Sequence, residues 1–114
     1  MEDSDAPGTY GKDVIGTAQT GNWVMYVKFN PGAWANWHWH KNPQSIYMVS
    51  GTMNYEVKPH PMVKLTPGSY MVIPARALHN GNCLGNEPCT LFIENLLPND
   101  KHATDANGKE LKRR

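Results

Sequence analysis

The chain has 114 residues, a length that fits one domain. Its formal net charge of +1 gives no electrostatic indication of nucleic-acid binding. No apolar run is long enough to span a bilayer, and no secretory signal peptide is visible. Nine prolines and ten glycines divide the chain into short segments. Such frequent interruption favours many short strands over a few long helices.

The first half of the chain is built of short alternating runs. Residues 1–20 are polar and predict an N-terminal arm or an edge strand. The next ten residues predict a strand with one apolar face, made of Trp23, Met25, Val27 and Phe29. Further strands are predicted at 33–40, 45–50 and 52–57, the last two joined by a hairpin-like turn at Ser50-Gly51.

The second half continues this pattern up to a polar tail. Strands are predicted at 62–65, 69–74 and 89–97, with a short connection at 75–79 and a long turn at 80–88. Residues 98–114 have little apolar content and predict a polar C-terminal tail. Together these elements predict an all-β sandwich or barrel over residues 21–97.

Two cysteines, Cys83 and Cys89, flank the predicted turn. Two thiols at this spacing do not make a zinc site, which leaves either free thiols or a disulfide that closes the turn. A disulfide would require an oxidising compartment. The location therefore depends on the start of the chain: cytoplasmic if Met1 is the native start, periplasmic or secreted if a leader has been removed.

The histidines raise the question of a metal. His38 and His40 are two residues apart on a predicted strand, so both point to one face, together with Trp34 and Asn36. Two imidazoles at that spacing can reach a single ion, although the same pattern also occurs as a structural or surface pair. Gln44 follows after an Asn-Pro break and offers a neutral oxygen donor.

Three further histidines differ in their surroundings. His79 follows a predicted strand and a short turn, and it completes a set of three imidazoles with one oxygen donor. His60 lies between two prolines and His102 lies in the polar tail, so neither is assigned a role. Metal-bound imidazoles need partners that fix their tautomers, and the asparagines at 36, 80 and 82 are near enough in sequence to serve.

The stretch GAWANWHWHKNPQSIYMVSG resembles the first motif of the cupin family, G-x5-H-x-H-x3-4-E-x6-G. The matching positions are Gly32, His38, His40, Gln44 and Gly51, with glutamine in place of the usual glutamate. The second stretch, GSYMVIPARALHNGNC, resembles the second cupin motif, G-x5-P-x-G-x2-H-x3-N. The matching positions there are Gly68, Pro74 and His79.

Two positions of the second motif depart from the family pattern. Arg76 replaces a glycine, which predicts an ordinary backbone conformation at that turn. Cys83 replaces the terminal asparagine. Motifs and spacer together cover residues 32–83, about half of the chain.

The resemblance implies a single small cupin β-barrel of the jelly-roll type with a metal inside one end. His38, His40 and His79 would carry over as ligands, and Gln44 would take the fourth position. One divalent transition metal is implied per chain: iron, manganese, nickel, copper or zinc. Because glutamine brings no negative charge, the ion would keep its full charge and act as a stronger Lewis acid. A barrel that has lost its metal is the alternative.

The resemblance permits several functions. The leading hypothesis is a metal-dependent, dioxygenase-like oxidoreductase that acts on a small organic molecule. A lyase or isomerase, and a metal- or ligand-binding protein without turnover, are alternatives. Glu94 is a candidate general base if it faces the interior, and Tyr55 is a candidate hydrogen-bond donor to a bound oxyanion. A homodimer is expected, with no nucleic-acid or membrane partner.

Overall fold

The computed structural model describes residues 7–17, 22–95 and 101–111. This part of the chain is all β, with strands in ten segments. They are β1 (Thr9–Ile15), β2 (Trp23–Phe29), β3 (Trp34–Trp39), β4 (Gln44–Ser50), β5 (Thr52–Val57), β6 (Val63–Leu65), β7 (Tyr70–Ile73), β8 (His79–Leu84), β9 (Cys89–Asn95) and β10 (His102–Ala103). No membrane-spanning helix occurs among these described residues.

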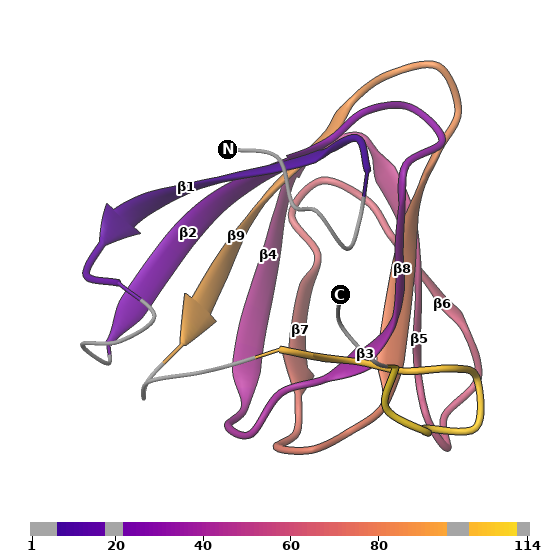
Figure 1. The fold of residues 1–114 in the computed structure, drawn as a ribbon. Helices are drawn as coiled ribbons and strands as arrows, with labels where there is room; N and C mark the ends of the chain where they lie inside the picture. Colours follow the sequence, from indigo (N-terminus) through magenta and orange to yellow (C-terminus); the bar gives the residue numbers. More distant parts are fainter. Residues whose placement is uncertain (1–6, 18–21, 96–100, 112–114) are drawn as a thin grey trace.

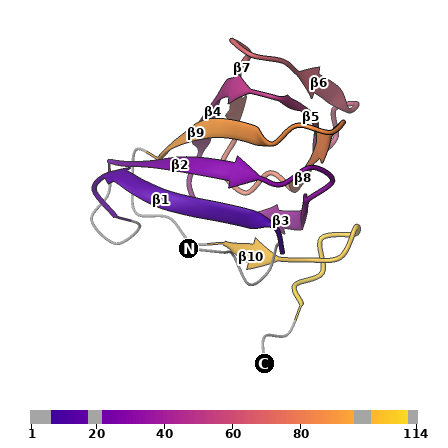
Figure 2. The same cartoon turned by 90° about the horizontal axis from the view of Figure 1, so that it is seen from above.

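The strands form two antiparallel sheets that face each other (Figure 1). One sheet has the order β1-β2-β9-β4-β7, and the other has the order β10-β3-β8-β5-β6. Seen from above, β1 and β2 lie near β3, whereas β7 and β6 lie together at the opposite side (Figure 2). The all-β jelly-roll architecture predicted from the sequence is confirmed.

The core fills the space between the two sheets. Alternation along the strands buries one face of each, as in β4, where Gln44, Ile46 and Met48 are buried. The buried hydrophobic residues are Val27, Phe29, Ala35, Ile46, Met48, Met53, Tyr55, Val57, Leu65, Ile73, Cys83, Cys89 and Leu91. Strands with one apolar face thus explain why two sheets stack rather than remain single layers.

The turn at Ser50-Gly51 is present, but it does not make a hairpin. β4 pairs with β7 and β9, whereas β5 pairs with β6 and β8, so the turn carries the chain from one sheet to the other. Gly51 has a φ of 80°, and a Cβ there would lie 2.8 Å from the Sγ of Cys89. Glycine is therefore required at this corner both for its conformation and for the close approach.

The predicted long turn at 80–88 is wrong over its first half, because residues 79–84 form β8. β8 is flanked by β3 and β5 within its sheet. Its glycine and asparagines resemble a turn sequence, yet Gly81 is needed in the strand. A Cβ on Gly81 would come within 2.8 Å of the Tyr55 ring, which packs against it from β5.

The segments predicted as arm and tail both contribute edge strands. β1 pairs with β2, and β10 pairs with β3 (Figure 2). The predicted domain boundaries at 20/21 and 97/98 lie outside the described residues.

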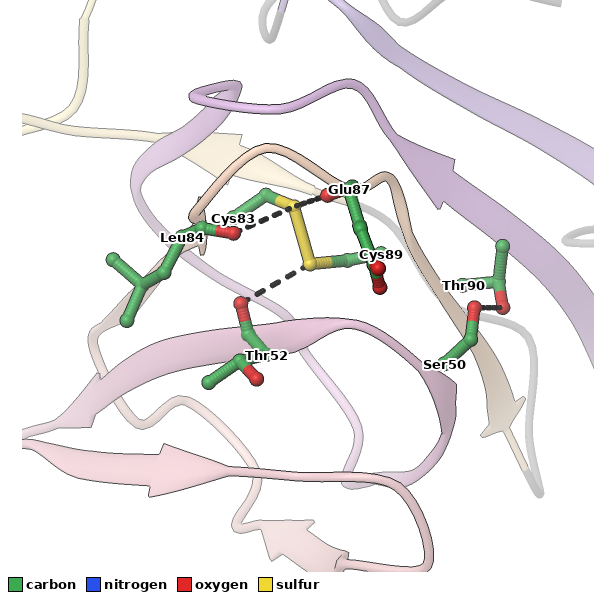
Figure 3. Close-up of a disulfide and its surroundings, with 7 residues drawn as sticks. All are labelled: Ser50, Thr52, Cys83, Leu84, Glu87, Cys89 and Thr90. Atoms are coloured by element: carbon green, nitrogen blue, oxygen red, sulfur yellow. Dashed lines mark hydrogen bonds between the residues drawn. A yellow bond between two sulfur atoms is a disulfide. The ribbon is translucent and has the colours of Figure 1, made fainter.

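The two cysteines pair as a disulfide between Cys83 on β8 and Cys89 on β9 (Figure 3). Their Cα atoms are 5.9 Å apart, within the usual range for a disulfide. The Sγ of Cys89 lies 3.1 Å from the carbonyl oxygen of Thr52. Since β8 and β9 belong to different sheets, the bond links the two layers at the end opposite the β4 start.

Removing this disulfide is expected to destabilise the fold. The Cys83→Ala/Cys89→Ala double variant should lose about 2 kcal/mol of unfolding free energy, because the crosslink restricts the unfolded chain over a short loop. Urea unfolding of the oxidised protein, the reduced protein and the double variant measures the effect. Equal midpoints for oxidised and reduced protein would contradict it.

Candidate metal centre

The first part of the site is an irregularity in β3. Ala35 pairs with Gly81 and His38 pairs with His79, so three steps along β3 face two steps along β8. This one-residue excess is a β-bulge, which reverses the alternation between Ala35 and His38. Both residues are therefore buried, whereas Trp34 is 49% exposed.

The prediction that Trp34 and Asn36 lie on the same face as the two histidines is consequently wrong. Asn36 is exposed and belongs to the bulge. Its side-chain oxygen accepts a hydrogen bond from the backbone N–H of Trp37 at 2.7 Å. A side chain thus satisfies a donor within the irregular part of the ladder.

The bulge also fixes the ring of His38. The Nδ1 of His38 lies 2.6 Å from the carbonyl oxygen of Asn36. A carbonyl can only accept a hydrogen bond, so Nδ1 carries the proton and Nε2 keeps its lone pair. The nitrogen that remains for a metal is therefore Nε2.

His79 begins β8 and is held in the same manner. Its Nδ1 donates to the carbonyl oxygen of Ala77 at 2.8 Å, which again leaves Nε2 with a lone pair. The rings of His38 and His79 have centroids 4.2 Å apart, as expected for directly paired residues on neighbouring strands. The partners that fix both rings are the backbone carbonyls of Asn36 and Ala77, so one of the three predicted asparagines serves, through its main chain.

His40 follows the end of β3. Its ring centroid lies 5.0 Å from that of His38 and 5.4 Å from that of His79. The carbonyl oxygen of His40 accepts a hydrogen bond from the backbone N–H of Arg76 at 2.8 Å. The turn between β7 and β8 is thereby attached to the residue that follows β3.

Arg76 does not have the ordinary backbone conformation that was predicted, because its φ is 64°. The left-handed conformation costs roughly 1–2 kcal/mol for a residue other than glycine. Two contacts offset this cost: the hydrogen bond to His40 and a guanidinium placed 5.7 Å from the ring centre of Trp39. The turn therefore keeps the geometry that a glycine usually provides.

The three histidines together form one cluster of possible ligands. One ring nitrogen from each lies within 4.8 Å of the others. Burial is the main cause that lowers the pKa of His38 well below its usual value, and the neighbouring His79 and His40 add to it. Burial likewise lowers the pKa of His79 to about 4. Both rings are therefore neutral at physiological pH, as metal ligation requires.

Gln44 faces the interior from the start of β4, in the opposite sheet. Its amide nitrogen donates to the Oδ1 of Asn95 at 3.0 Å. Asn95 is fully buried, and its own amide lies 3.5 Å from the carbonyl oxygen of Trp23. With the amide nitrogen of Gln44 engaged, its carbonyl oxygen is the atom suited to a metal.

Asn95 was not identified from the sequence. It stands at the end of the apolar run CTLFIEN. What marks it as part of the site is its pairing with Gln44 between β4 and β9, and this pairing is visible only in the folded structure. A polar side chain buried at such a position requires hydrogen-bond partners, and Gln44 supplies one.

The two candidate catalytic residues differ in their positions. Glu94 is exposed on β9, so it is an ordinary surface residue rather than a general base in the interior. It is not part of the histidine cluster. Tyr55 is buried, and its ring packs on Gly81, two residues from His79 along β8. Burial raises the pKa of Tyr55, so its hydroxyl stays protonated.

A groove of about 570 Å³ lies between β6 and β7, where the edges of the two sheets approach. Its lining is mostly apolar and includes Val57, Leu65, Met71 and Pro74. Val57, one of the lining residues, pairs with His79 across β5 and β8, but His38, His40, Gln44 and His79 do not themselves line the groove.

The donor set fits a divalent transition metal. Three neutral imidazoles converge, two of them with Nε2 set free by hydrogen bonds at Nδ1, and a buried amide oxygen is available on the facing sheet. Imidazole nitrogen suits zinc, copper, iron and nickel, and an oxygen donor extends the range to manganese.

The sequence profile of the ChrR cupin-like domain matches residues 3–97. No curated protein shows significant sequence similarity to the chain. Among solved structures, a cupin-like protein from Thermotoga maritima has a TM-score of 0.72 at 24% identity, over 87% of this chain and 80% of its own.

Two further structures exceed one quarter identity. KdgF from Halomonas sp. has a TM-score of 0.68 at 26% identity, over 83% of this chain and 85% of its own. A chain from a study of the DMSP lyases RdDddP and RnDddQII has a TM-score of 0.65 at 27% identity, over 73% of this chain but only 44% of its own. With the profile match over most of its length, the chain belongs to the ChrR cupin-like domain family of the cupins.

Proposed function

We propose that the protein is a mononuclear metal-dependent enzyme acting on a small organic molecule, with the ion held by His38, His40, His79 and Gln44. The observation that carries this proposal is the convergence of three ring nitrogens within 4.8 Å. Burial disfavours the protonated form of His38 and His79, so both rings stay neutral and keep an Nε2 lone pair that a metal can use.

When bound, a divalent ion in this neutral donor set would act as a Lewis acid on an oxygen of the substrate. The chain itself supplies the surroundings. The groove between β6 and β7 has room for a small, mainly apolar molecule, and its lining residue Val57 is the strand neighbour of His79. The protonated hydroxyl of Tyr55 is a candidate donor towards an anionic oxygen, since its ring lies on the same interior face.

For the reaction class, we propose dioxygenase-like chemistry first, because a neutral donor set and an apolar pocket suit an enolate- or catecholate-like substrate. A lyase reaction is the second candidate, supported by the likeness to a chain from the DMSP lyase study. Oxygen consumption with catechol- and enolate-type substrates tests the first. If the iron, manganese, copper and nickel forms all consume no oxygen, the dioxygenase reaction is excluded and the lyase candidate remains.

The metal site itself is tested by removing one ligand. His79→Ala should weaken zinc and manganese binding about a hundredfold or more, because it removes the ligand held by Ala77. The matched control is His60→Ala, which changes an exposed histidine outside the cluster. Calorimetric titration of chelator-treated protein gives both affinities. Wild-type affinity in the His79→Ala variant would contradict the assignment.

The stability of the metal-free protein should depend on the histidine cluster. The folded-state pKa of His79, about 4, lies below the ordinary value of 6.5, so protonation favours the unfolded chain. The stability that depends on a neutral His79 is fully present above about pH 6.5 and is lost as the pH falls through 4. The total loss in the free energy of unfolding is about 3 kcal/mol.

Urea unfolding between pH 7.5 and 4 measures this loss. His79→Gln should show a shallower dependence on pH than the wild type, because it lacks the titrating ring. The same pH dependence in both proteins would show that His79 is not held neutral by burial.

The Cys83–Cys89 disulfide supports a periplasmic or secreted location, since such bonds persist in oxidising compartments. The homodimer expected from the sequence stays a prediction.

A further inference from the structure

Three neighbouring strands, β2, β9 and β4, carry a row of paired residues at the end where β4 begins (Figure 1). Gln44 on β4 pairs with Asn95 on β9, and Asn95 pairs with Trp23 on β2. Asn95 is fully buried and Gln44 is 6% exposed, so neither amide can rely on bulk water for its hydrogen bonds. The row therefore decides how the fourth proposed ligand is presented.

A backbone carbonyl sets the orientation of both amides. The Nδ2 of Asn95 lies 3.5 Å from the carbonyl oxygen of Trp23, which can only accept a hydrogen bond. The Oδ1 of Asn95 is thereby turned towards Gln44. Because that oxygen is also only an acceptor, Gln44 meets it with its Nε2, at 3.0 Å. The Oε1 of Gln44 is consequently the atom turned away from Asn95.

The Oε1 of Gln44 accepts no hydrogen bond from any described residue, because the bond from Nε2 to Asn95 is the one that this side chain makes. Among buried side-chain atoms in the described part of the chain, only the Oγ1 of Thr9 lacks both a partner and accessible surface. The Oε1 of Gln44 therefore borders an accessible space. An oriented acceptor without a donor, in a side chain more than nine-tenths buried, is suited to a ligand.

Glutamate at position 44 does not fit this row. An ionised carboxylate has only acceptors, so it would face the Oδ1 of Asn95. Turning the Asn95 amide over would relieve that contact, but it would set the Oδ1 against the carbonyl oxygen of Trp23 instead. Either orientation leaves two acceptors facing each other in a buried position, which is unfavourable. Asn95 thus favours a neutral amide as the fourth donor.

A neutral amide leaves the charge of a bound ion uncompensated. The cluster of possible ligands found among the described residues consists of three histidines and contains no carboxylate. Neutral imidazoles and an amide carry no charge, so a divalent ion would keep both of its positive charges. In a buried site, such a charge attracts an anion far more strongly than it would in water. The ion therefore favours an anionic oxygen, of a carboxylate or an enolate, as its further ligand.

We propose that Asn95 is a positioning residue, which holds Gln44 as a neutral amide ligand and so makes the bound ion select an anionic oxygen of the substrate. This inference rests on the proposed function, because it concerns a ligand of the same site. It differs from a merely structural role for Asn95 in the sign of one effect. A structural asparagine supports metal binding whatever stands at position 44, whereas a positioning asparagine favours glutamine and opposes glutamate.

The test is a double-mutant cycle on the full chain, with Co²⁺ affinity measured by calorimetric titration of chelator-treated protein. With Gln44 in place, Asn95→Leu should weaken Co²⁺ binding about tenfold or more, because the Gln44 amide loses the group that orients it. In the Gln44→Glu background, Asn95→Leu should instead tighten Co²⁺ binding about fivefold, because it removes the opposing acceptor. Asn54→Leu on β5, outside the row, is the matched control and should leave the affinity unchanged.

The preference for an anion gives a second measurement, which does not depend on the Asn95→Leu variant. The visible absorption of the Co²⁺-loaded protein reports ligand binding, with acetate as the probe and acetamide as its neutral counterpart. Gln44→Glu should weaken acetate binding about tenfold, because its carboxylate cancels one charge of the ion. Acetamide binding should not change.

Three results would overturn the proposal. They are an Asn95→Leu variant that keeps the Co²⁺ affinity of the wild type, a loss of Co²⁺ affinity on Asn95→Leu in both backgrounds, and a Co²⁺-loaded wild type that binds acetate no more tightly than the Gln44→Glu variant does. A wild type that takes up no Co²⁺ would instead overturn the metal site, and this inference with it.

Discussion

The β-bulge between Ala35 and His38 decides which side chains of β3 face the interior. Without the extra residue, alternation from the buried Ala35 would turn Trp37 and Trp39 inward and both histidines outward. The bulge reverses this order and places His38 opposite His79. The carbonyl oxygen of Asn36, within the bulge, accepts the hydrogen bond from Nδ1 of His38. One backbone irregularity therefore both turns a candidate ligand inward and fixes its tautomer.

A buried partner, on the sheet that faces β3, accounts for a glutamine at position 44, where the family usually has glutamate. Asn95 lies between Trp23 and Gln44 across neighbouring strands, with its amide towards Trp23 and its carbonyl towards Gln44. A carbonyl needs a donor, which a glutamine amide supplies and an ionised carboxylate does not. The side chain at position 44 is thus coupled to a buried partner, and Gln44→Glu alone would place a second acceptor against the Oδ1 of Asn95.

Local patterns predicted the strands and the histidines, because apolar alternation and the H-x-H spacing are short-range features. Three other features depend on which strands become neighbours. The bulge is hidden in a run of tryptophans and asparagines with no clear alternation, and β8 resembles a turn because Gly81 must admit the Tyr55 ring. The placement of residues 102–103 beside Trp39 and His38 depends on the pairing of β10 with β3. Such long-range register is not encoded in any single stretch of sequence.

The central claim is that three imidazoles and one amide oxygen form a metal site. X-ray absorption at the metal edge, on protein loaded with one equivalent of zinc or iron, tests it most directly. The account predicts the multiple-scattering signature of about three imidazoles, with the remaining ligands light atoms and no sulfur. A spectrum without imidazole scattering, or a protein that retains no metal after loading, would contradict it.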